Sequence, residues 1–79
     1  MFVNPTVAVN VAVWNGAASI RHAKAGDEQA AIRCSNVILT LADTQDEDED
    51  AYFLAVVRRL GRVRALALGF EPAFVHDAI

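Results

Sequence analysis

The sequence predicts a mainly α-helical fold, in which an antiparallel helical hairpin follows an extended or β segment. Residues 17–42 and residues 46–70 both carry apolar side chains at the three- and four-residue spacing of amphipathic helices. Before them, residues 1–15 contain a valine-rich stretch with a different period. We treat residues 1–79 as a single small domain, because a chain of this length supports one core.

The valine-rich stretch favours a β-strand. Every second position from 7 to 13 is a valine, which is the period of a strand. The dipeptide Asn15-Gly16 follows, and it is a strong hairpin signal, although the next residues form a poor return strand. Two alternatives stay open: an α+β fold with an N-terminal β-hairpin, and an all-α three-helix fold. In the latter, Asn4 caps a helix whose first residue is Pro5.

The first helical stretch contains a glycine near its middle. The apolar spacing keeps its phase across Gly26, which predicts one helix over residues 17–42. The pair Asp27-Glu28 is also typical of a helix start, so a break at Gly26 is the alternative. Cys34 is the only cysteine; it cannot form an internal disulfide, and we expect a buried thiol on the apolar face.

The second helical stretch opens with an acidic run, Asp43-Thr44-Gln45-Asp46-Glu47-Asp48-Glu49-Asp50. Carboxylates are favoured at the positive end of a helix, so we interpret the run as a connection and helix start. Gly61 disfavours a helix by about 1 kcal/mol relative to alanine, and we expect a point of close approach or of flexibility within a continuous helix. Pro72 marks the end of that helix. Residues 71–79 are then an apolar tail, which we expect to dock on the body or on a neighbouring subunit.

Two charged residues fall inside the apolar stripes of the predicted hairpin. Counting from a turn near Thr44 places Arg64 opposite residues 24–28 of the preceding helix. We therefore predict a structural ion pair between Asp27, or Glu28 beside it, and Arg64. Such a pair fixes helix register more than it adds stability.

The composition predicts self-association. Hydrophobic residues make up 54% of the chain, against about 45–50% in average proteins with glycine included. A small domain cannot bury so much apolar surface alone, so we expect a homo-oligomer, most simply a dimer, or a protein partner. Either the valine strand pairs edge to edge with a second copy, or the hairpin face forms a four-helix bundle with its copy. The interface candidates are Val9, Val11, Val13, Trp14, Phe53, Val57, Leu60 and Phe74.

The charge balance disfavours a nucleic-acid partner. The net charge is −3, whereas nucleic-acid-binding domains usually carry a basic footprint. The alternative function is a small nucleic-acid-binding regulator that uses a basic patch of Arg58, Arg59 and Arg62, with Arg64 nearby. No basic leader and no apolar run of about 20 residues is present, so we expect a cytoplasmic protein without membrane contact.

The sequence offers little chemistry. It has no phosphate-binding glycine loop, no nucleophile elbow and no metal-ligand spacing, so we expect no enzyme activity, no cofactor and no metal. The prediction is a small, non-enzymatic protein–protein interaction module that self-associates and acts as an inhibitor, adaptor or accessory factor. Compact acidic proteins of this size, including those encoded by phages and mobile elements, often act in these ways, which is an association from size and composition alone.

Overall fold

The computed structural model describes residues 3–79, and all regular structure within that range is helical. The elements are α1 (Pro5–Lys24), α2 (Glu28–Asp43), the short 3-10 helix η1 (Asp46–Asp48), α3 (Glu49–Leu60), α4 (Arg62–Ala67) and α5 (Pro72–Ala78). The prediction of a mainly α fold is confirmed. The described range contains five α-helices and no strand, so the all-α alternative comes nearest, with more and shorter helices than expected.

The predicted N-terminal β segment is wrong, because those residues form the first half of α1. Asn4 caps the helix: its Oδ1 accepts hydrogen bonds from the N–H groups of Thr6 at 2.9 Å and Val7 at 3.4 Å. Pro5 occupies the first turn, where its missing N–H costs nothing. A second pattern, of small residues at helical spacing, coexists with the valine alternation and forms the buried face of α1: Ala8, Ala12, Gly16 and Ser19. Residues 1 and 2 of the predicted segment lie outside the described range.

Gly26 separates α1 from α2, so the single helix predicted across it is wrong and the alternative with a break is found. Gly26 has a φ of +82°, which favours glycine, and its N–H donates to the carbonyl of Ala23 at 3.1 Å. The N–H of Asp27 donates to the carbonyl of His22 at 2.9 Å, which completes a Schellman C-cap. Asp27 then caps α2, since its Oδ1 accepts from the N–H of Ala30 at 3.1 Å.

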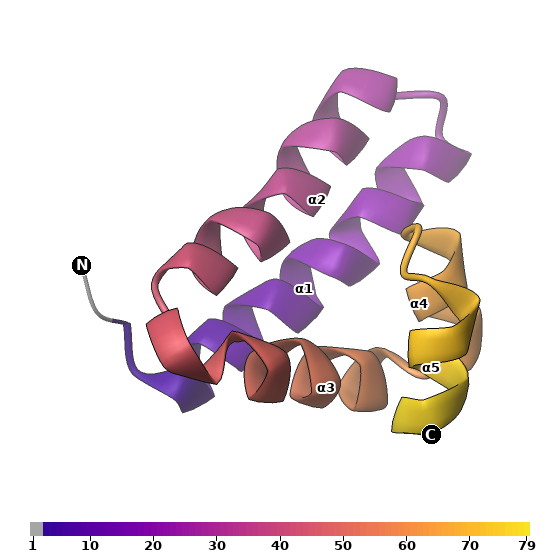
Figure 1. Cartoon of the computed structure of the whole chain (residues 1–79). Helices are drawn as coiled ribbons and strands as arrows, with labels where there is room; N and C mark the ends of the chain where they lie inside the picture. The colour runs from indigo at the N-terminus through magenta and orange to yellow at the C-terminus, as the bar shows by residue number, and fades with distance from the viewer. Residues whose placement is uncertain (1–2) are drawn as a thin grey trace.

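The antiparallel hairpin exists, but α1 and α2 form it. The two helices lie side by side over most of their length (Figure 1). The hydroxyl of Ser19 on α1 donates to the carbonyl of Ala31 on α2 at 2.7 Å, and both residues are buried. The small side chains along the inner face of α1 let the helices approach closely. Their connection is the turn at Gly26, not the acidic run.

The second predicted helix, residues 46–70, is also divided. Gly61 adopts φ +85° and ψ 165°, a conformation that side chains with a Cβ rarely adopt, and it ends α3 and precedes α4. The axis therefore changes direction where a continuous helix was expected. α3 crosses the end of the α1–α2 hairpin, and α4 and α5 form a second arm beside it (Figure 1).

The predicted apolar tail is itself a helix. Pro72 stands in the first turn of α5, where proline is favoured, so it begins a helix as well as following one. Val75 and Ala78 of α5 are buried against α3 and α4. The C-terminal residues thus dock on the body of the chain.

The core consists of two apolar clusters that α3 joins. Val56 faces the first cluster and Val57 faces the second, and both side chains are fully buried. The first cluster combines α1, α2 and α3: Ala8, Ala12, Ile38, Ala42, Tyr52, Val56 and Leu60. The second combines α3, α4 and α5: Val57, Ala65, Val75 and Ala78. One helix therefore holds both arms in place.

The molecule is thin, which leaves each helix with an outward face. Its extents are 36 × 29 × 15 Å, and its radius of gyration is 11.9 Å. Helices pack about 8–10 Å apart, so the smallest extent accommodates about two layers of helices. No helix in residues 3–79 is both long enough and apolar enough to cross a membrane.

Candidate functional site

The predicted interface residues separate into buried and exposed groups. Val57 is 0% exposed and Leu60 is 3% exposed, so both belong to the core of the chain itself. Val9 and Val13 are half-buried and pack against the first cluster. The predicted four-helix bundle through Phe53, Val57 and Leu60 therefore loses two of its three contact residues to the core, and the predicted strand pairing lacks a strand.

The remaining two α1 candidates lie on the outside of that helix. Trp14 is 74% exposed and Val11 is 38% exposed, and Val7 one turn earlier is 50% exposed. These three positions are spaced by four and three residues, so they form one row, outside the face of the buried small residues. We call Val7, Val11 and Trp14 the outer stripe of α1.

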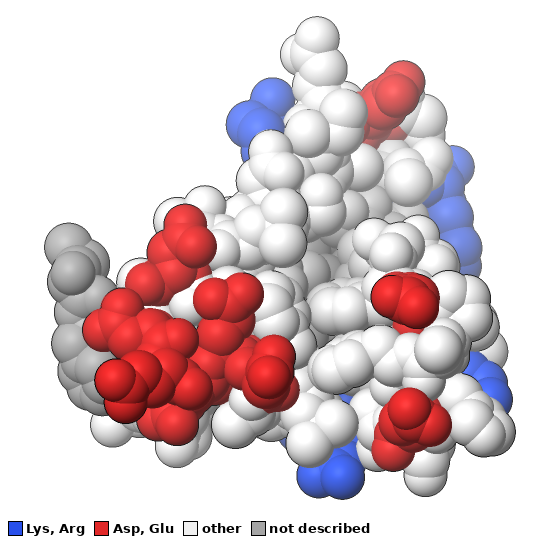
Figure 2. Space-filling view, in the orientation of Figure 1, with Lys and Arg blue, Asp and Glu red and all other residues white. Residues whose placement is uncertain are grey.

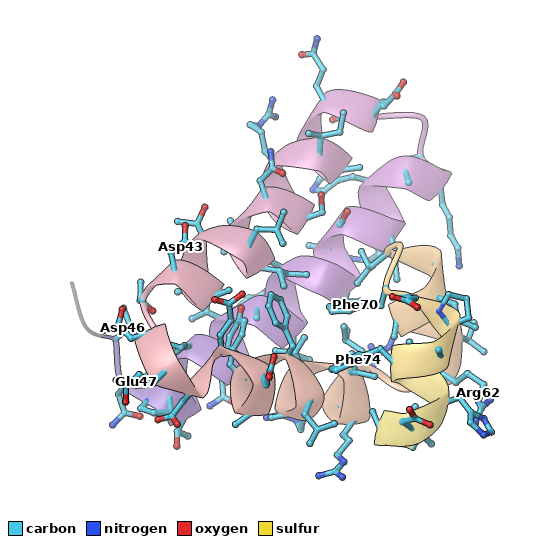
Figure 3. All side chains as sticks on the ribbon, in the orientation of Figure 1. Asp43, Asp46, Glu47, Arg62, Phe70 and Phe74 are labelled. Atoms are coloured by element: carbon cyan, nitrogen blue, oxygen red, sulfur yellow. The ribbon has the colours of Figure 1, made fainter. Side chains whose placement is uncertain are left out.

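Opposite charges flank the two ends of the outer stripe. The exposed side chains of Arg21 and Lys24 lie in the last turn of α1. At the other end, Asp48 lines a hollow together with Pro5 and Thr6 of the first turn. Figure 3 shows the acidic connection beside the start of α1, with Asp46 and Glu47 labelled. The acidic run, predicted as a connection and helix start, contains η1 and supplies the first turn of α3.

The predicted basic patch serves intrachain contacts. The Nε of Arg58 donates to the carbonyl of Ala78 on α5 at 2.8 Å. The Nη1 of Arg59 donates to Oδ1 of Asn10 on α1 at 2.8 Å. Arg62 lies beyond the Gly61 break, at the outer edge of the α4–α5 arm (Figure 3). Two of the three guanidinium groups thus fasten neighbouring helices to α3, which leaves them less free to contact phosphate groups.

The structure gives both members of the predicted Asp27–Arg64 pair other partners, and so corrects that prediction. The Nε of Arg64 donates to the carbonyl of Leu60 at 2.7 Å, and its Nη2 donates to the carbonyl of Arg59 at 3.2 Å. These are carbonyls at the end of α3, where a helix lacks its own donors. Asp27 caps α2. The counting assumed two uninterrupted helices, and the breaks at Gly26 and Gly61 invalidate it.

A second surface is a trough between α2 and the α4–α5 arm. It consists of three adjoining hollows of about 400, 240 and 380 Å³ that are open to solvent. Leu68 lines the first two hollows, and Leu39 and Phe70 line the last two, so the trough is continuous. We call it the α2–α5 groove. Its large apolar lining residues are Ile32, Ile38, Leu39, Phe53, Leu68, Phe70 and Phe74.

Aromatic rings form the end of the groove that lies over α3. The rings of Phe53 and Phe70 meet edge to face, with centroids 6.1 Å apart and planes at 72°. Figure 3 shows Phe70 and Phe74 on the side of the α4–α5 arm that faces α3. The predicted interface residues Phe53 and Phe74 are thus brought together here, although no interface of this shape was expected.

Sequence reasoning missed the α2 side of this groove. Ile32 and Leu39 are 51% and 60% exposed, and they lie off the apolar stripe that α2 buries. The signal that points to them is the presence of two large aliphatic side chains, two helical turns apart, on an otherwise polar face. Such a pair indicates a second apolar contact that the first stripe does not explain.

The buried polar groups serve the fold. The hydroxyl of Tyr52 donates to the carbonyl of Ile38 at 2.7 Å, and burial raises the pKa of the phenol to about 12. Cys34 is half-buried rather than fully buried. In the part of the chain that the structure describes, no group of three or more His, Cys, Asp or Glu residues is placed to hold a metal ion.

No protein-family model matches the chain, and comparison with curated proteins and with solved structures gives no match either. The functional argument therefore depends on the outer stripe of α1, the α2–α5 groove and the charges around them.

Proposed function

We propose that this chain is a non-enzymatic protein–protein interaction module that self-associates through the outer stripe of α1. The observation that carries the proposal is the exposure of Trp14, which is 74% exposed at the end of a row of exposed apolar side chains. Large apolar residues in a row on a surface are typical of association sites, and Trp is enriched among residues that dominate binding energy. As such a module, the chain acts as an inhibitor, adaptor or accessory factor.

The charges favour a second copy as the partner. Homodimers are commonly two-fold symmetric, and a two-fold axis across the stripe makes the two α1 helices antiparallel. The same flank of both helices then meets at opposite ends. Arg21 and Lys24 of one copy approach the acidic connection near Pro5 and Thr6 of the other. In this register the two Trp14 side chains meet at the centre, residue 7 of one copy lies opposite residue 21 of the other, and opposite charges meet at both ends.

The dimer is expected to be weak. The outer stripe runs from residue 7 to residue 14, which is about 10 Å at 1.5 Å per residue. A contact of this size buries less than the roughly 1,200–2,000 Å² of a stable interface. We therefore expect a dissociation constant in the micromolar range or weaker. Added salt should weaken it further, because it screens exposed charges.

Sedimentation velocity across a concentration series tests the proposal. The test variant is Trp14→Glu, and the matched control is Val63→Glu, because Val63 on α4 is 81% exposed and lies outside both surfaces. We expect the unmodified chain and the control to dimerise with rising concentration and Trp14→Glu to stay monomeric. Circular dichroism verifies that both variants keep their helices. Equal dimerisation of the two variants, or a monomeric unmodified chain at all concentrations, contradicts the proposal.

A further inference from the structure

The α2–α5 groove has apolar side chains along both sides. Ile32 and Leu39 stand on the α2 side, two turns apart, and each is more than half exposed. Leu68 and Phe70 stand on the side of the α4–α5 arm. Figure 1 shows the two arms diverging from α3, and the three hollows are lined by residues of both arms. A row of large apolar groups is thus left on the surface in addition to the outer stripe of α1.

The shape of the groove suits side chains from one face of a helix. Its three hollows follow α2 in sequence and are shallow and open, unlike the enclosed cavities that surround most of a small ligand. A helix lying in a groove inserts residues spaced by three, four and seven positions. The distance from Ile32 to Leu39 along α2 is about 10 Å at 1.5 Å per residue, which matches the same seven-residue spacing on a partner helix.

The charged residues that line the groove have one sign. Glu28 lines the hollow at one end, and Asp50 and Glu71 line the hollow at the other end. None of the lining residues described for the three hollows is Lys or Arg. Figure 2 shows this face as an uncharged area between a large acidic group near the start of α3 and further acidic side chains over the other arm. A cationic ligand is therefore attracted from both sides.

We propose that the α2–α5 groove binds a basic amphipathic helix of a partner protein. The apolar face of that helix fills the three hollows, and its Lys or Arg side chains reach the carboxylates of Asp50 and Glu71. A second copy of this chain fits less well, because its net charge is −3 and the rim would repel it. The inference rests on the proposed role as an interaction module, but it does not depend on pairing through α1.

Three labelled peptides of about 18 residues, long enough to form a helix, test the groove by fluorescence anisotropy. The first has Leu on one helical face and Lys elsewhere. The second replaces every Lys by Glu, and the third scrambles the first so that Leu is spread over all faces. We expect the Leu/Lys peptide to bind about tenfold or more tightly than either control, and its affinity to fall as salt rises.

Variants of the chain locate the binding. Leu39→Gln is expected to lower the affinity for the Leu/Lys peptide by about tenfold, since it removes most of one buried aliphatic contact. Glu71→Gln is expected to lower the affinity by about threefold and to reduce the dependence of the affinity on salt. The matched control is Val63→Gln, which changes an apolar side chain outside the groove and is expected to leave the affinity unchanged.

Four results overturn the inference: no binding of the Leu/Lys peptide, equal binding of the Leu/Glu peptide, equal weakening by Val63→Gln and Leu39→Gln, or loss of self-association in Leu39→Gln. The last result would mean that a second copy covers the groove. Trp14→Glu is expected to leave peptide affinity unchanged. If the chain is monomeric but binds the peptide, only the proposed pairing through α1 is contradicted. If the chain dimerises but does not bind the peptide, only the proposed binding in the groove is contradicted.

Discussion

Tyr52 combines burial and hydrogen bonding in one side chain. It is 3% exposed and donates to the carbonyl of Ile38 at 2.7 Å. Burial raises its pKa from 10.0 to about 12, so the native state holds the phenolic proton to higher pH than the unfolded state does. The corresponding stability is complete below pH 10 and is lost as the pH rises through about 12.

Replacing this phenol should reduce the dependence of the unfolding free energy on pH above about pH 10. The unmodified chain is expected to lose about 2–3 kcal/mol of unfolding free energy through this group, at 1.36 kcal/mol per pKa unit. Tyr52→Phe is expected to lack that loss, although it starts about 1 kcal/mol less stable because one buried hydrogen bond is missing. Urea unfolding of both proteins at several pH values provides the comparison. Since the chain has a single Tyr, its absorbance reports the titration directly, and a native-state midpoint near 10 would contradict this account.

At the scale of the element, Gly16 is the point where α1 meets three neighbours. A Cβ there would lie 3.0 Å from Cδ1 of Leu68, 3.3 Å from Cδ2 of Leu60 and 3.5 Å from Cδ1 of Ile38. Gly16→Ala is expected to be nearly neutral, because about 1 kcal/mol of helix propensity offsets the crowding. Gly16→Val is expected to cost about 1–3 kcal/mol through overpacking.

Thermal unfolding measures these two changes. Ala23→Val provides the control, because it adds the same branched side chain to an exposed position of α1. We expect it to cost only about 0.5 kcal/mol, the difference in helix propensity. If Gly16→Val is as stable as the unmodified chain, α1 does not pack against its neighbours as closely as described.

Gly61 acts through the backbone alone. Apart from its own residue and its chain neighbours, nothing lies within 4 Å of the position that a Cβ would take, yet φ is +85°. Gly61→Ala is therefore expected to cost about 1–3 kcal/mol, in contrast to the same substitution at Gly16. Urea unfolding of the two variants side by side makes the comparison. Equal stabilities would mean that the connection between α3 and α4 is free to change its backbone angles.

Local sequence patterns predicted some elements correctly and others wrongly. The helix expected from Asp27 onwards is found as α2, because its cap and its apolar spacing agree. The valines of α1 alternate as in a strand, while the small residues of the same segment recur at helical spacing. Only the packing of those small residues against α2 and α3 decides in favour of the helix. The break at Gly26 was only the alternative prediction and the break at Gly61 was not predicted, because the apolar spacing continues in phase across both glycines.

At the scale of the whole molecule, the candidate site was only partly predictable. Trp14 and Val11 were expected at an interface and lie exposed, whereas Val57 is buried because α3 packs on two sides. Which neighbours cover a face of α3 depends on the path of α4 and α5, which no local pattern contains. The groove that includes Phe74 arises from the same path, and for that reason it was not foreseen.

The two proposed surfaces should act independently. None of the residues of the outer stripe lines the α2–α5 groove. The free-energy effects of Trp14→Glu on dimerisation and of Leu39→Gln on peptide binding are therefore expected to appear unchanged in the double variant. Sedimentation and anisotropy on the single and double variants measure them. A difference above about 0.5 kcal/mol between single and double variants would mean that the surfaces are coupled.

The emission of Trp14 tests the central claim, self-association through α1, most directly. This residue is the only Trp in the chain and lies at the centre of the proposed contact. As the concentration of the unmodified chain rises, its emission should shift to shorter wavelength, because the indole leaves water, and added salt should reverse the shift. An emission that stays that of a solvent-exposed indole, at concentrations where sedimentation shows a dimer, would contradict pairing through α1.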